Sequence, residues 1–399
     1  MLGPDCSRSA LWPRDRRQAL VAAVLLWAMP MLVITVEVIL HPLHRSVTRD
    51  SYHYAAGKWW VHESLYVGPS GFNYLPQFAI LFSPFHFLPV RLGEVLWRWC
   101  AAAMLIGGLW QTLTRLFRSE PERAFFWATL LSMPLSMCAL QNGNANAHFG
   151  GVLMLCVAAI LAERWWLALA LMALATAIKP LGIVLLMLAP LVYAPMRWRL
   201  PLVVLALALF PFLFAGPGYA WSQYRGAWTN LQACAVVTEH RFADINGFFR
   251  TFGAALPPQA SKLVRVVAGA MTAGLWWWGA RRLREPQTAL WFYALAASYL
   301  MLFNPMNEEN SYVILSPALG IWGAWFLLGP GENERHLGWT LVFMALTMGL
   351  LPNFLHPLFG NYFALFWHPF MTIVFVAMLT HFVWRSAASG AGELHLQPV

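Results

Sequence analysis

Long apolar stretches recur along the whole chain, and they constrain its fold more than any other feature. Residues 19–40, ALVAAVLLWAMPMLVITVEVIL, are one example, and about 17–25 predominantly apolar residues suffice to cross a bilayer as a helix. Hydrophobic residues make up 59% of the chain and charged residues only 11%, against about a quarter in soluble domains. The stretches are continuous rather than alternating, which favours helices over a barrel. The sequence therefore predicts an all-α membrane protein.

Arginines cluster at the ends of these stretches, as the positive-inside rule predicts for cytoplasmic loops. Several precede residues 19–40, so we expect an uncleaved first helix with its N-terminus in the cytoplasm. Residues 72–90 are interrupted by three prolines, and a crossing there would place the arginines of RLFRSEPER outside. We therefore expect a short interfacial or re-entrant helix on the outer face at 72–90, a long external loop at about 216–261, and about twelve transmembrane helices in all.

The net charge of +9 and the five cysteines add little about function. The positive charge follows from arginines at helix ends, so it does not indicate a nucleic-acid partner. The cysteines show no CxxC or other metal-ligand spacing. No P-loop, GxSxG or HExxH motif is present, which argues against nucleotide hydrolysis, serine hydrolysis and zinc peptidase chemistry.

One carboxylate follows the first apolar stretch, in VTRDSYHYAAGKWW at residues 47–60. Asp50 lies on the outer side in the predicted topology, where it is placed to accept a proton from a hydroxyl as a general base. The alternative is structural, because Asp50 also precedes a plausible short helix and would suit its N-cap. His53 would lie one turn along that helix, where an isolated histidine is more often structural. Both interpretations of Asp50 stay open.

Lys179, in ALATAIKPLGIVLL, is a stronger indication of a functional site than Asp50. A charge flanked by long apolar segments is expensive and usually faces a cavity or the protein interior. Pro180 breaks the helix there, so the ammonium group is placed to meet a phosphate; snorkelling to the interface is the alternative. Arg241 and Arg250 also fall outside in the predicted topology, and an anionic ligand is the simplest explanation for them.

Two further segments place polar side chains on the same side of the membrane. QNGNANAH, at residues 141–148, offers amides that either hydrogen-bond a ligand or end two helices. NPMNEENSY, at residues 304–312, places Glu308 and Glu309 at a helix start, where capping by at least one of them is expected. A divalent cation held by Asp50 with Glu308 or Glu309 is a further alternative.

The order of these features resembles glycosyltransferase family 87, the polyprenol-phosphate-dependent membrane enzymes with a C-type glycosyltransferase fold. The resemblance rests on RDSYHYAAGKWW with FNYLPQFAILFSPFHFLPV, then GNANA, ATAIKP and FNPMNEENSYVILSP. It implies one membrane domain over residues 1–399 with a juxtamembrane first external loop. The family module would cover residues 19–320, and residues 321–399 would add helices and a short tail.

The resemblance also implies roles for individual residues. Asp50 matches the catalytic base, and Lys179, supported by Arg241 or Arg250, would bind the donor phosphate. The residues expected to bind substrate are His53, Asn144, Asn146, Glu309 and Asn310. The sequence departs from the family pattern at Asn144, where members commonly carry Gln, and at Asn310, where many carry His. Leu75–Pro76–Gln77 likewise replaces the usual Pro-Pro pair.

The expected function is transfer of a mannose-like hexose from a polyprenyl-phosphate sugar to a hydroxyl of a lipid or glycan acceptor. The reaction would occur on the outer face of the cytoplasmic membrane, and it needs a base and cations but no cofactor. Asp50 and Lys179 should then line one cavity. A transporter or flippase for lipid-linked or small anionic solutes, with Lys179 and Glu37 in its path, is the alternative, although no inverted repeat is evident. A non-catalytic assembly factor is a third possibility, and it would tolerate replacement of Asp50.

Overall fold

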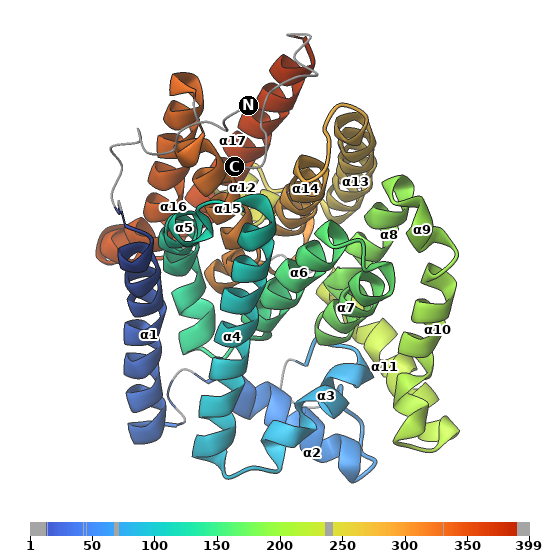
Figure 1. Ribbon diagram of the computed structural model, residues 1–399. Coiled ribbons are helices and arrows are strands. Elements are labelled where there is room, and N and C mark those ends of the chain that lie inside the picture. The colour runs from blue at the N-terminus through green and yellow to red at the C-terminus, as the bar shows by residue number, and fades with distance from the viewer. Residues whose placement is uncertain are drawn as a thin grey trace.

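Helices form every regular element in the part of the chain that the computed structural model describes, which is residues 13, 15–42, 44, 46–67, 72–235, 242–329 and 331–388 (Figure 1). The all-α prediction is confirmed for these residues. In chain order the elements are α1 (Arg16–Leu40), η2 (Thr48–His53), α2 (Tyr54–Trp60), α3 (Pro76–His86), α4 (Val90–Leu116), α5 (Pro121–Gln141), α6 (Ala145–Leu161), α7 (Trp165–Ile178), η3 (Pro180–Gly182), α8 (Ile183–Val192), α9 (Ala194–Arg197), α10 (Leu200–Leu209), η4 (Phe210–Leu213), α11 (Pro217–Cys234), α12 (Ile245–Thr251), α13 (Pro258–Ala280), α14 (Gln287–Phe303), η5 (Glu309–Ile314), α15 (Ser316–Leu328), α16 (Glu332–Phe359) and α17 (Tyr362–Ala388).

Six helices within the described residues are long and apolar enough to cross a membrane. They are α1, α4, α5, the segment Ala194–Leu213, α16 and α17. Five further apolar helices are shorter: α7, for example, has 14 residues, which at 1.5 Å per residue gives about 21 Å against a hydrocarbon core of roughly 30 Å. The chain is thus a helical protein of membrane character, and the count of about twelve spans stays a prediction.

Small residues let the central helices approach closely. A Cβ atom added to Gly108 in α4 would lie 2.5 Å from the Cβ of Met154 in α6, and one added to Gly151 would lie 2.6 Å from the Cβ of Met104. Such glycines bring helix backbones together in membrane proteins, where the hydrophobic effect drives little helix association. The α4–α6 pair therefore forms a tightly packed centre.

Helix α1 lies along α5 at the edge of the bundle (Figure 1). Ala23, Trp27, Met31 and Ile34 are buried against the bundle, whereas the opposite face of α1 exposes valines and leucines. The Trp27 indole donates a hydrogen bond of 3.2 Å to the Thr129 hydroxyl. A helix that is apolar on both its packed and its exposed face fits a lipid environment.

The segment at 72–90 forms the short helix that its prolines predict. Helix α3 has 11 residues and begins at Pro76, where the missing N–H group costs no hydrogen bond. Pro89 is the N-cap of α4, so the chain turns there into the next long helix. In Figure 1, α2 and α3 lie together at one end of the bundle, beside α11. The prediction of a short helix is confirmed, while its place at a membrane surface stays a prediction. The expected long loop at 216–261 contains α11 and α12.

Candidate functional site

The turn that carries Asp50 is a single π-helical segment, η2, which continues directly into α2. Its N-cap position is Val47, so the N-cap interpretation of Asp50 is wrong. Thr48, Ser51 and Tyr52 are buried, whereas the Asp50 side chain is 84% exposed. Isolated π-helical turns are frequent at functional sites. The turn therefore buries one face and presents the Asp50 carboxylate on the other.

Tyr52 connects this turn to the start of α6 through a hydrogen bond. Its hydroxyl lies 2.8 Å from the Tyr74 hydroxyl and accepts a hydrogen bond of 3.1 Å from the Ala145 backbone N–H. Its ring meets Phe78 edge-on, with ring centroids 4.8 Å apart. Burial raises the pKa of Tyr52 to about 12, so the hydroxyl stays neutral. The position of η2 relative to the Asn-rich turn is thus fixed by packing and by hydrogen bonds.

Glu94, in the first turns of α4, hydrogen-bonds the η2 segment. The sequence analysis did not predict this role of Glu94. Its buried carboxylate accepts hydrogen bonds from the Thr48 hydroxyl, from the Ser46 hydroxyl at 3.0 Å, and from the Arg98 guanidinium. His53 Nε2 lies 3.6 Å from the same carboxylate. The i,i+4 spacing of Glu94 and Arg98, both inside an apolar stretch, was the available signal.

Arg98 extends the contact to the end of α5. Its Nε and Nη2 atoms donate to the Gln141 carbonyl, at 3.2 and 3.1 Å. The Gln141 side chain in turn donates a 3.0 Å hydrogen bond to Glu37, so the acid within the apolar helix α1 has a polar partner. One chain of polar contacts therefore connects α1, the η2 segment, α4 and α5.

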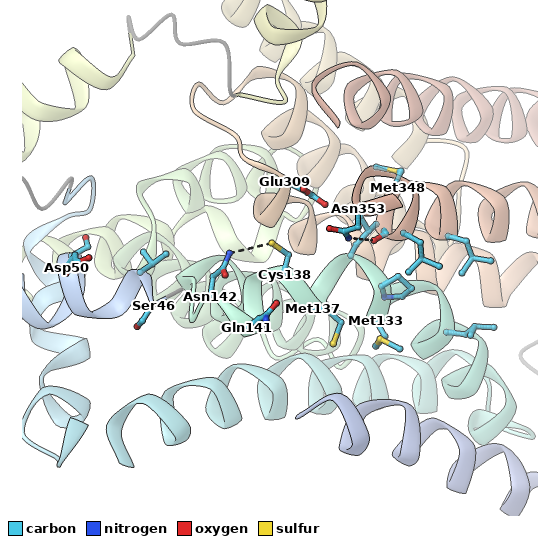
Figure 2. A pocket seen from close by; sticks show the side chains of 18 residues that line it. Ser46, Asp50, Met133, Met137, Cys138, Gln141, Asn142, Glu309, Met348 and Asn353 are labelled. Atoms are coloured by element: carbon cyan, nitrogen blue, oxygen red, sulfur yellow. Dashed lines mark hydrogen bonds between the residues drawn. The ribbon is translucent and has the colours of Figure 1, made fainter. Parts of the chain in front are cut away.

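Asp50 lines a groove of about 980 Å³ between α5 and α16, called here the α5–α16 groove. Asp50 lies at one end and Met348 towards the other, with Asn142 and Glu309 between them (Figure 2). Burial raises the pKa of Glu309 above its ordinary value. The described lining contains no Lys or Arg. Acids and amides therefore form the polar part of the described wall, and the exposed Arg49, which does not line it, lies 3.9 Å from the Asp50 carboxylate.

Lys179 lines a different, smaller cavity of about 300 Å³, called here the Lys179 pocket. Lys179 ends α7, where Pro180 prevents the helix from continuing. Among the described residues its ammonium has no hydrogen-bond or ion-pair partner. The wall also includes residues from each predicted polar segment, namely Asn144, Asn146, Glu308 and Asn310.

The amides of the Lys179 pocket form a network. Asn144 caps α6 by accepting the Asn146 backbone N–H at 3.0 Å, and Asn146 Nδ2 donates to Asn310 Oδ1 at 3.1 Å. Asn310 Nδ2 donates to Glu308 at 2.9 Å, and Glu308 forms a capping box with Ser311 at the start of η5. The capping prediction for Glu308 or Glu309 is confirmed. Asn146 Oδ1 is buried, and no described residue donates to it.

The two cavities adjoin at η2, because Val47 and Ser51 line both. The expectation of one cavity shared by Asp50 and Lys179 is therefore replaced by two neighbouring cavities with a helical turn between them. Glu37 lines neither, so Glu37 and Lys179 do not share a path through these cavities.

The remaining predicted residues lie elsewhere. His53 faces Glu94 and His86 and lines neither cavity, and Arg250, at the end of α12, also lines neither. Arg241 lies outside the described residues. In the described ranges no three His, Cys, Asp or Glu side chains gather closely enough to hold a metal ion.

Fold and site together define a helical membrane protein with an acid-lined groove beside a pocket that contains a lysine. The model of glycosyltransferase family 87 matches residues 72–305, which is more than half of the chain. No curated protein and no solved structure matches it. The chain belongs to glycosyltransferase family 87, as its motifs predicted. Asn144, Asn146 and Lys179 fall inside the matched segment, whereas Asp50, Glu309 and Asn310 fall outside it.

Proposed function

We propose that the protein transfers a mannose-like hexose from a polyprenyl-phosphate sugar to a hydroxyl of a lipid or glycan acceptor, with Asp50 as general base. The reaction takes place on the outer face of the cytoplasmic membrane. Family membership supplies the reaction class. The observation that supports the residue roles is the η2 turn, which lies between the cavity that contains Lys179, together with Glu308, and the groove that contains Asp50 and Glu309.

The donor phosphate binds Lys179 in this proposal. The Lys179 ammonium lies in a pocket whose wall also carries amides, hydroxyls, apolar side chains and one carboxylate, that of Glu308. Glu308 accepts a hydrogen bond from Asn310. A charge-assisted hydrogen bond from the ammonium stabilises the phosphate as it leaves. The amides of Asn144, Asn146 and Asn310 are hydrogen-bond partners for the hydroxyls of the sugar. Arg250 lines neither cavity, so Lys179 carries the phosphate contact alone among the described candidates.

The acceptor hydroxyl meets Asp50 at the junction of the two cavities. Its oxygen forms a bond to the anomeric carbon while the bond from that carbon to the phosphate oxygen breaks. Asp50 takes the hydroxyl proton, and the lipid phosphate leaves with the electron pair. Because a phosphate is a good leaving group, base and cation suffice, and general-base assistance contributes typically about 10²–10⁴-fold.

The test is transfer from radiolabelled polyprenyl-phosphate mannose in membranes that contain the wild type, Asp50→Asn or Glu63→Gln. Glu63 is an exposed acid that follows α2 and lines neither cavity, so its variant is the matched control. We expect Asp50→Asn to lose about 10²–10⁴-fold in rate and Glu63→Gln to keep wild-type activity. Equal rates for all three proteins would remove Asp50 from the mechanism. Absence of transfer with every polyprenyl-phosphate sugar, together with movement of lipid-linked sugar across vesicles, would favour the transporter.

A further inference from the structure

The α5–α16 groove changes character along its length. From the Asp50 end, its wall carries Ser46, Asn142, Gln141 and Glu309, and the remainder includes Met133, Met137 and Met348 (Figure 2). One amide, that of Asn353, lies near Met348 and donates to the Gly349 carbonyl of its own helix at 3.5 Å. Methionine side chains are flexible and adapt to irregular apolar ligands. The volume of about 980 Å³ lies at the upper end of the range for ligand pockets, about 300–1,000 Å³. An occupant that fills it has a polar head and an apolar tail.

The walls of the groove also indicate where such a tail would lie. Helices α5 and α16 are both long and apolar enough to cross a membrane. Leu350 lines the groove and is 45% exposed, so the groove reaches the apolar outer surface of α16. A hydrocarbon chain held against the methionines would therefore extend towards lipid. A water-soluble glycan would leave this apolar part unfilled, at a cost in buried hydrophobic contact.

Charge distinguishes the occupant of the groove from the phosphate-bearing donor. Asp50 and Glu309 line the groove without any Lys or Arg in the described lining. The described cation nearest to Asp50 is the Arg49 guanidinium, 3.9 Å away, and Arg49 does not line the groove. A phosphate placed between Asp50 and Glu309 would therefore meet two carboxylates of its own sign, with no Lys or Arg in the described wall to bind it. The Lys179 pocket, by contrast, supplies an ammonium group, and its one described carboxylate, Glu308, accepts a hydrogen bond from Asn310. The groove thus suits an uncharged head group rich in hydroxyls.

We propose that the α5–α16 groove is the acceptor site and that the acceptor is an uncharged glycolipid, a sugar carried on a hydrocarbon chain. The sugar lies along the polar stretch from Asp50 to Glu309, and the chain lies against the methionines. The proposal rests on the proposed function for the reaction that follows binding. Glu309 and the α16 wall lie beyond residue 305, outside the segment that the family model matches.

Photo-crosslinking tests the site with the full-length protein in lipid nanodiscs, which avoids competition from detergent. The probe is dodecyl glucoside with a diazirine near the end of its chain, and the comparison probes are methyl glucoside and dodecyl phosphate with the same photoreactive group. We expect the dodecyl glucoside to label residues 130–138 and 346–353, with at least ten times less labelling by either comparison probe.

Two variants of α16 sharpen the test. Leu350→Trp narrows the groove, whereas Phe343→Trp places the same bulk at an exposed position of α16 that does not line it. We expect Leu350→Trp to lower labelling by dodecyl glucoside at least tenfold and Phe343→Trp to leave it unchanged. Equal labelling of both variants would overturn the proposal, as would groove labelling by dodecyl phosphate or methyl glucoside as strong as that by dodecyl glucoside.

Measuring donor binding distinguishes failure of the acceptor assignment from failure of the proposed function. Binding of undecaprenyl phosphate should be the same in Leu350→Trp as in the wild type, because the donor occupies the Lys179 pocket. Loss of that binding in Leu350→Trp would place the donor in the groove and overturn the acceptor assignment. Groove labelling without any transfer from polyprenyl-phosphate sugars would instead contradict the proposed function while leaving the glycolipid site in place.

Discussion

The Thr48 hydroxyl donates a hydrogen bond to the buried carboxylate of Glu94, so a charged side chain of α4 holds the turn that presents Asp50. The two residues are 46 positions apart in the sequence. Glu94 is itself paired with Arg98, and both side chains are almost completely buried. Glu94 touches neither cavity and is a positioning residue for the turn.

Glu94→Gln should destabilise the protein by about 3–5 kcal/mol, because it leaves the buried Arg98 guanidinium without its counter-charge. Thr48→Val should cost about 1–3 kcal/mol, since it removes one hydrogen-bond donor from the same carboxylate. Thr48→Ser, which keeps the hydroxyl, is the control. The free energy of unfolding from denaturant titration in mixed micelles measures all three. Unchanged stability in Glu94→Gln would show that the pair does not support the turn.

Lys179→Met should weaken the binding of undecaprenyl phosphate at least about tenfold, because a hydrogen bond to a charged group is worth about 1.5–3 kcal/mol. The apolar Met side chain keeps the length of the Lys stem and removes the charge. Lys262→Met changes an exposed lysine of α13 that lines neither cavity and should have no effect. Equilibrium binding in nanodiscs gives the comparison, and equal affinity in the two variants would contradict the phosphate assignment.

His86 should make the protein less stable in mildly acidic solution. Its Nδ1 atom lies 3.3 Å from His53 Nδ1, and partial burial and the neighbouring His53 both lower the pKa of His86 from 6.5. The unfolded chain then binds more protons than the folded one below about pH 6.5, so stability falls as pH falls.

The measurement is the unfolding midpoint temperature between pH 7.5 and 5.5 for the wild type and His86→Gln. The variant should show a smaller decrease than the wild type. His336→Gln, at an exposed position of α16, should decrease as the wild type does. A decrease in His86→Gln as large as that in the wild type would assign the pH dependence to other groups.

Gly143→Ala should destabilise the Asn-rich turn by about 1–2 kcal/mol, because Gly143 has φ +64° and L-residues are strained there. The added Cβ would also lie 3.0 Å from Arg98 Nη2. Gly107→Ala is the control, since no described atom lies within 4 Å of its added Cβ and its helical position should gain about 0.5–1 kcal/mol. Denaturant titration measures both, and a neutral Gly143→Ala would contradict the strain argument.

Sequence patterns predicted those features that depend on local chemistry. The prolines at 76 and 89 predicted the short helix before α4, and the Lys179–Pro180 pair predicted the end of α7. Polar segments far apart in the sequence were expected to come together, and Asn146 and Asn310 do so in one cavity. These predictions succeeded because a helix end is specified by the few residues around it.

The rest depends on tertiary contacts that no single segment specifies. The partition into two cavities follows from the packing of η2 against Tyr74 and Ala145. Local sequence patterns do not predict these contacts between distant segments. In the sequence, Glu94 is a single acid among apolar residues. Its role is evident only from the fold, in which the Ser46 and Thr48 hydroxyls donate to its carboxylate. The role of Arg241 stays a prediction.

Ser51 lines both cavities, so they are separated at this point by a single helical turn. Two ligands can then be held at once, and neither has to depart before the other arrives. With the donor in the Lys179 pocket and the acceptor in the groove, as proposed, we expect a ternary complex with free order of entry, for which double-reciprocal plots against the two substrates intersect. In this scheme the sugar moves from donor to acceptor in one step, so no covalent glycosyl–enzyme intermediate forms.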